Sequence, residues 1–600
     1  MTKFRTCDVL IIGGGSAGLR AAIEAHDAGA QVLIISKGKK EDPHTTQARG
    51  GINAALGTMD PEDSWMMHAA DTLREGEFLA DYERVETLCK NAPDAINELV
   101  NWGARFHREK DGRLTQRFFG AHTYRRTVFY EDWTGQEIVR VLLNQVNQRK
   151  KIEIIDYVLI TKLLESDDDV GGGGEEQAER EVKGAIGIDI GKREIVVFEC
   201  KSLILAAGGY TRVYKVSSSR VSENCGEGVT LAYEAGADLV DMEMVQFHPT
   251  GMVWPEKAVG TLATEAIRGE GGILLNSKGE RFMKNYYPER MELGPRDVVA
   301  RAVYSEIVAG RGTEHGGVWL DVTHLPKEKI LDRLPTMYEQ FKELDGIDIS
   351  KQKMEVAPTA HYSMGGVVVD MECRTKVKRL FAVGETISQI HGANRLGGNS
   401  LLDTVVFGKI AGSQAARLAK EIVEIEKTRP PSQLSVNNNR GLFGDGMFII
   451  LKEPLKFSDE IQDLMTQCAG IVRDETNLKN GLKGILELKN KFYSKDNILK
   501  ESNINDENIV DQLKASWELR SFLLACEAII RSALIRQESR GAHYRSDFPK
   551  LDDEKWKVNI FCRKEGDEMT IFKEKVKEIK GLLADFLNMH VKVEHHREFE

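Results

Sequence analysis

Four side chains that could bind an anion stand in short turns framed by glycine or proline. They are His248, Arg296, His361 and Arg395. A guanidinium suits a carboxylate because its planar N–H groups form two parallel hydrogen bonds with the two oxygens. Any one of these arginines alone would more often belong to a structural ion pair. The four together predict a site for a small dianion.

Two further segments contribute reactive side chains. Residues 262–272 place a hydroxyl, a carboxylate and a guanidinium among glycines, at Thr264, Glu265 and Arg268. Near the N-terminus, His44 precedes the glycine pair Gly50-Gly51. By residue type alone such a histidine is more often a capping or surface residue, so its role stays open at this point.

The strongest structural motif that could position these groups lies at the N-terminus. An apolar strand, residues 7–12, runs into the turn Gly13-Gly14-Gly15-Ser16-Ala17-Gly18, and a helix-like stretch and a second apolar strand, residues 31–35, follow. Strand, Gly-x-Gly-x-x-Gly turn, helix and strand in this order predict a Rossmann-type dinucleotide site. Its helix N-terminus would offer free N–H groups to the phosphates. Because Ser36-Lys37 replaces the usual acid after the second strand, NAD, NADP and FAD all stay open.

Later segments indicate how the chain is divided. An apolar strand at residues 201–209, another near Leu380 and a helix from about residue 398 to 420 resemble parts of the same nucleotide domain. We therefore expect an α/β fold in which a Rossmann-like domain, residues 1–244 and 361–420, is interrupted by an α+β domain, residues 245–360. Apolar residues at intervals of three and four predict a helical domain, residues 440–545.

Two segments of low apolar content remain. The acidic, glycine-rich run 166–176 is typical of a mobile surface loop. Residues 546–600 form a short C-terminal domain or tail, which is charged from 562 onward, and we expect one amphipathic helix near 570–588.

Composition excludes several classes of protein. A length of 600 residues predicts two to four domains, and a formal charge of −11 argues against nucleic acid as a partner. No apolar run approaches the roughly 18 residues of a membrane span, and no apolar signal core opens the chain. The eight cysteines lack a Cys-x-x-Cys pair, which argues against a metal site and favours buried, reduced thiols. We expect a location in the cytoplasm.

Taken together, the motifs closely resemble the flavoprotein subunit of succinate dehydrogenase and fumarate reductase. The stretches that carry the resemblance are His-Pro-Thr-Gly from 248, Arg-Gly-Glu-Gly-Gly from 268, Ala-His-Tyr-x-Met-Gly-Gly from 360 and Gly-Ala-Asn-Arg-Leu-Gly-Gly-Asn-Ser-Leu from 392, with a return at residues 538–543. The resemblance implies a Rossmann-like FAD-binding domain under an inserted capping domain. It also implies interconversion of succinate and fumarate by hydride transfer, as in electron transport and the tricarboxylic acid cycle.

The same resemblance implies which residues hold FAD. They are Gly13, Gly14, Gly15, Ser16, Ala17, Gly18, Ser36, Lys37, His44, Thr45, Gly50, Gly51, Glu227, Glu385, Ser400 and Leu401. His44 matches the histidine that bonds covalently to the flavin ring. Two positions depart from the family: Arg49 stands where glutamine is common, and Glu227 replaces an aspartate.

For the reaction itself, the resemblance implies that Arg296 transfers the proton, with Glu265 and Arg268 as its relay. His248, Thr264, His361 and Arg395 would hold the dicarboxylate. An arginine as acid or base conflicts with its usual pKa above about 12. A relay through a glutamate would make a transient neutral guanidine less costly.

Electrons must leave or enter through another chain, because the sequence shows no cluster motif. The expected partner is an iron–sulfur subunit and, through it, membrane anchor subunits or a thiol-oxidising partner, which would place the chain peripherally on the cytoplasmic side of the membrane. Alternatives are L-aspartate oxidase, which usually lacks the matching histidine, a thiol-linked fumarate reductase flavoprotein, and a non-catalytic flavin-binding assembly subunit, which the retained Arg296 disfavours.

Overall fold

The computed structural model describes residues 2–165, 180–428, 450–494 and 507–590. The expected surface loop at 166–176 lies outside the described residues, as do residues 440–449 and 591–600. The main sheet has seven strands in the order β6 (Ile152–Ile155), β2 (Val32–Ile35), β1 (Thr2–Ile12), β9 (Glu194–Leu205), β8 (Val182–Asp189) and β7 (Val158–Glu165), with β16 (Leu380–Ala382) paired to β9. Strands β6, β2, β1, β9 and β16 run parallel, and β8 is antiparallel to both of its neighbours, β9 and β7.

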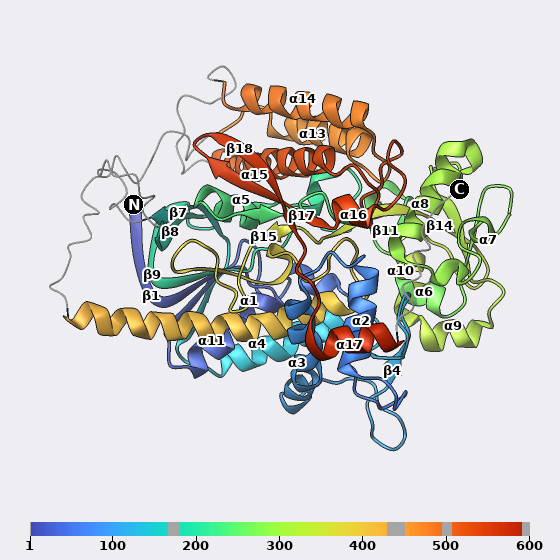
Figure 1. Ribbon diagram of the computed structural model, residues 1–600, viewed down its shortest axis with the longest axis horizontal. Helices are drawn as coiled ribbons and strands as arrows, with labels where there is room; N and C mark the ends of the chain where they lie inside the picture. Colours follow the sequence, from blue (N-terminus) through green and yellow to red (C-terminus); the bar gives the residue numbers. More distant parts are fainter. Residues whose placement is uncertain (1, 166–179, 429–449, 495–506, 591–600) are drawn as a thin grey trace.

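Helices cover one side of this sheet (Figure 1). They are α1 (Ser16–Asp27), α4 (Thr134–Asn147) and α11 (Asn399–Thr428). Two glycines of α11 let it approach α1 closely, since a Cβ on Gly408 or Gly412 would lie 2.8 or 2.2 Å from a carbonyl oxygen of α1. The predicted helix from residue 398 is confirmed, and it extends beyond Lys420. Strand β9 is also present, but it begins earlier than predicted and ends at Leu205.

An inserted segment forms a separate layer with its own hydrophobic core, seen in light green at the right of Figure 1. Its four-stranded sheet has the order β11 (Val245–Met252), β14 (Met354–Ser363), β13 (Val318–Asp321) and β12 (Ile273–Leu275). Around it lie α6 (Glu265–Gly269), α7 (Met283–Tyr286), α8 (Arg296–Glu306), α9 (Lys327–Arg333) and α10 (Pro335–Leu344). Because β11 and β14 are antiparallel neighbours, the chain enters and leaves this layer at adjacent points.

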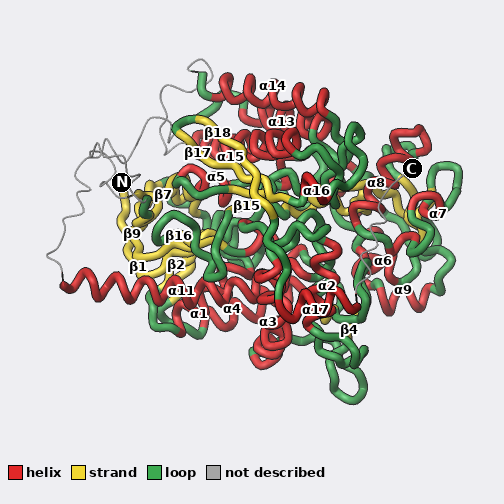
Figure 2. The backbone as a smooth tube through the Cα atoms, in the orientation of Figure 1, coloured by secondary structure: helices red, strands yellow, loops and turns green. Residues whose placement is uncertain are grey.

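Three long helices follow, packed together at the top of Figure 2. They are α13 (Pro454–Cys468), α14 (Glu475–Phe492) and α15 (Glu507–Ile535), which confirms the helical prediction for this region. The apolar face of α15 includes Trp517, Phe522 and Ile529, and it shares one core with the main sheet. The helix ends at Ile535, short of residue 545. The other N-terminal elements are α2 (Trp65–Glu75), α3 (Tyr82–Asn101), α5 (Glu227–Glu234) and the sheet β3 (Ile52–Asn53), β5 (Thr127–Val128), β4 (Gln116–Arg117).

The predicted amphipathic helix near 570–588 is confirmed only for its C-terminal part. Residues 558–575 form a hairpin of β17 (Val558–Glu565) and β18 (Glu568–Lys575), and only α17 (Gly581–His590) is helical. The hairpin joins β10 (Leu239–Val240) and β15 (Gly366–Val367) in one sheet. Its strands are held in register by eight residue pairs and by Phe561 stacked on Phe572, with ring centroids 5.0 Å apart. Pairing of β18 with β17, which in turn pairs with the distant β10, overrides the local helical pattern.

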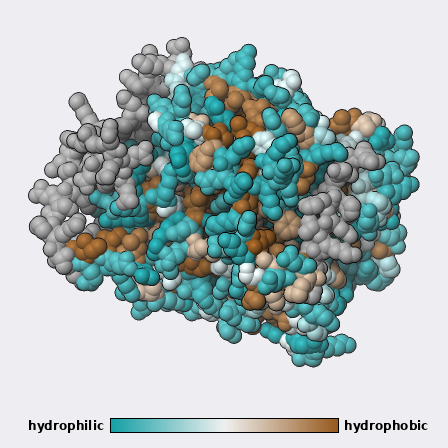
Figure 3. Space-filling model, in the orientation of Figure 1, coloured by the Kyte–Doolittle hydropathy of each residue, from teal (hydrophilic) through white to brown (hydrophobic). Residues whose placement is uncertain are grey.

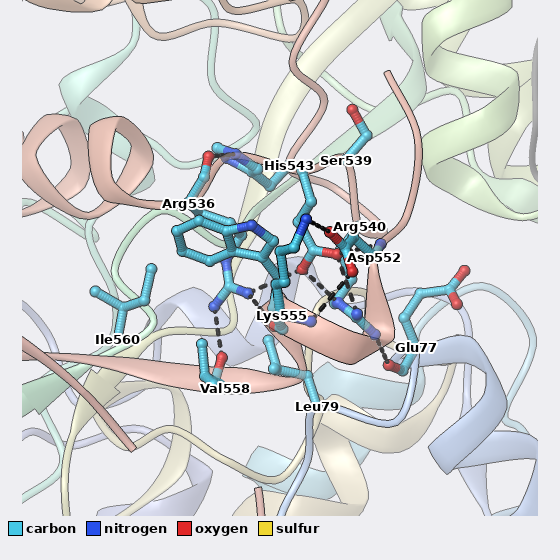
Figure 4. Close-up of polar contacts among 12 residues, drawn as sticks. Glu77, Leu79, Arg536, Ser539, Arg540, His543, Asp552, Lys555, Val558 and Ile560 are labelled. Carbon is cyan, nitrogen blue, oxygen red and sulfur yellow. Dashed lines mark hydrogen bonds and ion pairs between the residues drawn. The ribbon is translucent and has the colours of Figure 1, made fainter. Parts of the chain in front are cut away.

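A buried polar network anchors the segment between α15 and the hairpin (Figure 4). Arg536 donates to Glu243 at 2.7 Å and to the Val558 carbonyl at 2.9 Å. Arg540 donates to the carbonyl of Glu77 at 2.8 Å and to Asp553 at 2.6 Å. These bonds join the helical region, the hairpin and the loop before α3, and they supply partners for guanidinium groups that would otherwise be costly to bury.

The visible surface is mostly hydrophilic, with an apolar strip along the outer end of α11 (Figure 3). Within the described residues no helix combines the length and apolar character that crossing a membrane requires. All eight cysteines are buried as free thiols, as the sequence predicts.

Candidate active site

One cavity of about 570 Å³ extends from the glycine turn after β1 to the inserted layer. Its lining contains every residue that the resemblance assigns to FAD except Gly18. It also contains Arg296, His248, Thr264, Glu265, His361 and Arg395, but not Arg268. Residues from distant parts of the sequence therefore meet at one place.

The glycine turn has the geometry of a phosphate cradle. Gly13 has φ +118°, and a Cβ there would lie 2.1 Å from the carbonyl oxygen of Ala206. A Cβ on Gly18 would lie 2.0 Å from the carbonyl oxygen of Gly13, so Gly18 serves packing behind the turn. Helix α1 begins after Gly15, which has no side chain to cap it, and the Ser16 backbone N–H donates to the Thr45 hydroxyl at 3.2 Å. Its N–H groups and dipole therefore suit a phosphate.

An ion-paired cluster lies at the end of β2. Lys37 pairs with Glu227, and at 3.1 Å with Glu518 of α15. Burial acts to lower the pKa of Lys37, but the two carboxylates raise it well above its usual value. The first residue of α5 thus places a carboxylate beside the end of β2, where the sequence has no acid of its own. The glycine cradle, this cluster and the length of the cavity fit a dinucleotide cofactor.

His44 lies on the cavity wall, with its side chain 28% exposed. It begins a single turn of 3-10 helix, residues 44–47, directly after Pro43. Its Nδ1 lies 2.9 Å from Oε2 of Glu223, which also lines the cavity. Burial acts against the charged ring, but the bond to Glu223 and its charge raise the pKa of His44 above the usual value.

Arg296 is the first residue of α8 and is held from two sides. Its Nε and Nη2 donate to Glu265 Oε2 at 2.9 and 2.7 Å, and its Nη1 donates to Gln246 at 3.1 Å. Burial would raise the pKa of Glu265, but the charges of Arg296 and Arg268 lower it to about 2. The carboxylate is therefore ionised. An arginine at a positive helix N-terminus adds to the potential that attracts an anion.

Arg395 lies beside Arg296 and shares its acceptor. Its Nη2 donates to Gln246 Oε1 at 3.0 Å and its Nη1 to Ser400 at 3.2 Å, while its guanidinium lies 4.4 Å from the ring centroid of Tyr362. Its Nε is buried without a hydrogen-bond partner. Burial and then the charge of Arg296 lower the pKa of Arg395. An added anion would stabilise this guanidinium.

Two histidines face each other across the same end of the cavity, with ring centroids 5.4 Å apart. The backbone N–H of Thr250 donates to Nδ1 of His248 at 3.3 Å, which leaves Nε2 as the protonated nitrogen. His361 Nδ1 lies 2.9 Å from the hydroxyl of Ser218. Burial, followed by neighbouring cationic arginines, lowers the pKa of both rings well below the usual value. Both are neutral near pH 7 and can donate hydrogen bonds.

Thr264 and Arg268 complete the group. The Thr264 hydroxyl is buried without a partner on the cavity wall, and it precedes α6 without capping it. Arg268 lies behind the wall, where its charge acts on Glu265 but its hydrogen bond goes to the Glu292 carbonyl. Of the two steps of the expected relay, the Arg296–Glu265 step is hydrogen-bonded and the Glu265–Arg268 step is electrostatic. The unpartnered Thr264 hydroxyl and Arg395 Nε fit a small, oxygen-rich dianion.

Comparisons with known proteins agree with this geometry. Residues 8–401 match the family model described as FAD binding domain, and residues 458–589 match the fumarate reductase flavoprotein C-terminal family. A chain of the fumarate reductase (CoM/CoB) of Methanothermobacter marburgensis is 46% identical over 93% of this chain and 97% of its own length. The succinate dehydrogenase flavoprotein subunit of Rickettsia conorii is 36% identical, over 92% and 91%.

A solved structure of a variant E. coli quinol fumarate reductase FrdA superposes with a TM-score of 0.85 at 31% identity, covering 96% of this chain and 98% of that one. The chain belongs to the family of succinate dehydrogenase and fumarate reductase flavoprotein subunits. It is an FAD-dependent oxidoreductase.

Sequence reasoning missed several residues in or directly behind the wall of this flavoprotein's cavity. Gln246 bridges the two arginines, and its place two residues before His248 on a strand was a usable signal, because such residues share a face. Glu223 and Phe119 gave no motif signal. Arg49, noted as a departure from the family, lies 4.9 Å from the ring centroid of Trp133 and donates to Gln340 of the inserted layer.

Proposed function

We propose that the chain binds fumarate and succinate between Arg395, Arg296, the two histidines and Thr264, and interconverts them. The observation that carries this proposal is the pair of arginines on one Gln246 oxygen, facing two neutral imidazoles. Arg395 forms no ion pair with any carboxylate of the described residues, so its charge is available for a substrate carboxylate. Because His248 and His361 are neutral, they can donate hydrogen bonds to the dianion without transferring a proton to it.

Bound FAD supplies the hydride transfer, and the chain's own residues supply positioning and the proton. Arg296 exchanges the proton at the neighbouring substrate carbon, because it reaches the cavity while Glu265 holds two of its N–H groups. Glu265 and the charge of Arg268 support this exchange by keeping a compensating charge next to the guanidinium. The hydrogen bond from the Gly120 backbone to Glu265, at 2.9 Å, joins the FAD-binding layer to the inserted layer at this point.

We further propose that FAD is attached covalently at His44 and that electrons pass through an iron–sulfur subunit. That partner, with any membrane anchor, would hold the chain on the cytoplasmic side of the membrane. Both proposals rest on the family and on the place of His44 on the cavity wall. Acid denaturation followed by a gel would leave fluorescent flavin on the protein band. The His44→Ser variant would bind FAD in its native state but release it on acid denaturation.

A thiol-linked electron source is favoured over a quinone. The 46% identity to the CoM/CoB enzyme exceeds the 31% identity to the E. coli quinol enzyme, and both comparisons cover almost the whole chain. Purification of the native complex and identification of its co-eluting chains would distinguish the two. A thiol-oxidising partner chain supports the thiol link, and a quinone-binding membrane anchor contradicts it.

The central test is fumarate reduction by the purified holoprotein with a reduced dye as electron donor. We expect fumarate-dependent dye oxidation and the reverse reaction with succinate. Ammonia release from L-aspartate in place of these activities would make the chain an L-aspartate oxidase. Bound FAD with neither activity would support the non-catalytic alternative.

A further inference from the structure

The side chain that faces His44 is an unexpected carboxylate. Glu223 lies in the loop before α5, 179 residues from His44 in sequence, and its Oε2 lies 2.9 Å from Nδ1 of the ring. Both side chains are partly buried, 19% and 28% exposed, on the wall of the FAD cavity. Partial burial of a charged carboxylate is unfavourable unless other groups compensate the charge, so its partners have to be identified.

The carboxylate is held rigidly from its other side. Arg220 donates to Glu223 Oε1 through Nε at 3.0 Å and Nη2 at 2.6 Å, and Arg220 is in turn held by Asp42, two residues before His44. Burial would raise the pKa of Glu223, but His44 and Arg220 lower it to about 2. Glu223 is therefore an ionised acceptor with a fixed direction, and it returns to the segment that carries His44.

An ionised acceptor at Nδ1 determines which nitrogen of the neutral ring keeps its proton. Nδ1 keeps its proton as the donor to Glu223, and Nε2 carries the lone pair. A carboxylate partner also makes the opposite nitrogen more basic and more nucleophilic. Attachment of a carbon to the ring requires such a free, electron-rich nitrogen.

We propose that Glu223 is the positioning residue for covalent attachment of the flavin, holding His44 in the tautomer whose Nε2 is the nucleophile. This inference rests on the proposed attachment of FAD at His44. In the balanced step, an Nε2–carbon bond forms at a ring methyl group of FAD, one C–H bond of that methyl breaks, and the alkylated ring gives up its Nδ1 proton on the side of Glu223. The two electrons and two protons released in total are taken up by fumarate, the substrate, which becomes succinate.

The charged groups around His44 set the expected pH dependence. Glu223 and Arg220 face it from the loop before α5, Glu385 from the turn after β16, and His361 from β14. Glu223 and Glu385 favour the protonated ring, and Arg220 opposes it. Since attack needs neutral His44, attachment should become faster as the pH rises through its raised pKa. Loss of the Glu223 charge should move that midpoint to lower pH and slow the reaction on the plateau.

The test measures attachment of flavin, apart from turnover. Apoprotein is mixed with FAD and fumarate at a series of pH values, denatured in acid at timed intervals, and the flavin fluorescence of the protein band is recorded. The variants are Glu223→Gln, which keeps the shape and removes the charge, and His44→Ser, which removes the attachment point. Glu41→Gln is the matched control, because Glu41 is exposed and close in sequence but lies outside the cavity lining.

We expect Glu223→Gln to bind FAD in full but to attach it about tenfold more slowly or worse, with the midpoint at lower pH. Glu41→Gln should match the wild type. Attachment by Glu223→Gln at the wild-type rate with an unchanged pH profile would overturn the role of Glu223 while leaving attachment at His44 intact. A wild-type protein that releases all its flavin would overturn the attachment itself, and this inference with it.

Discussion

Arg296→Lys is the substitution that tests the proposed chemistry most directly. It keeps a positive charge but replaces the planar fork with a single ammonium group. Arg296 donates three hydrogen bonds, two to Glu265 and one to Gln246. A lysine at the same position can reach one of these acceptors but not both, so Glu265 loses part of the partner that keeps its buried charge stable.

The loss can be sized from these contacts. If two of three hydrogen bonds that involve a charge are lost at about 1.5–3 kcal/mol each, the total is roughly 3–6 kcal/mol. At about 1.4 kcal/mol per factor of ten, this predicts a fall of about two to four orders of magnitude in turnover. The range matches the roughly 10²–10⁴-fold that a positioned acid or base usually contributes.

The assay follows fumarate reduction with a reduced dye, together with flavin content and the Kd of a dicarboxylate inhibitor. We expect turnover to collapse while flavin content stays normal and the inhibitor still binds. Arg301→Lys is the matched control, because Arg301 lies on the same helix, paired with Asp297 and outside the cavity. Turnover of Arg296→Lys within tenfold of the wild type would refute the assignment. The role would then pass to His248 or His361, although the lowered pKa of each means that little of its protonated form is present near pH 7.

Other contacts give four further predictions. Arg395→Ala should weaken inhibitor binding about tenfold or more, measured by flavin absorbance, because a substrate carboxylate loses its bidentate partner. Arg49→Gln should raise the KM for fumarate while FAD content stays unchanged, because the bond to Gln340 between the two layers is lost. An unchanged KM would show that this bond does not affect how the inserted layer sits over the cavity. Burial and then the charge of Glu243 raise the pKa of Asp241, so the folded state binds this proton more tightly than the unfolded state does. The free energy of unfolding therefore falls as the pH rises from the unfolded pKa near 3.9 to the raised folded pKa. The melting temperature of Asp241→Asn relative to the wild type should therefore increase from pH 5 to pH 8, and a constant difference would contradict this. The chain without partners should not co-sediment with vesicles, and strong co-sedimentation would show that the proposed membrane location needs no partner.

The two residues that depart from the family pattern line the cavity proposed for FAD, and each makes a contact between distant segments. Arg49 reaches Gln340 of the inserted layer, and Glu227 pairs with Lys37 at the end of β2. The residues proposed to bind the substrate match the family pattern.

Local sequence alone determined the FAD cradle and the family. Gly18 is required by a close contact with the Gly13 carbonyl within one strand–turn–helix unit, so local sequence explains it, whereas Gly13 is required by the carbonyl of Ala206, which follows β9. Helical periodicity was likewise sufficient for α13, α14 and α15. The expectation that the four anion-binding candidates stand in turns is wrong for three of them, because His248 lies in β11, His361 lies in β14 and Arg296 begins α8.

Only the tertiary structure decided which of those residues act together. Gln246 joins Arg296, 50 residues away, to Arg395, 149 residues away, and nothing local to any of the three predicts that shared oxygen. The pairing of Glu223 with His44 depends in the same way on how the loop before α5 folds over the cavity. The C-terminal hairpin shows the opposite failure, since a helical pattern near residue 570 gave way to a strand that β17 holds by hydrogen bonds. Contacts between distant segments depend on how sheets and layers pack, and that information is spread over the whole chain.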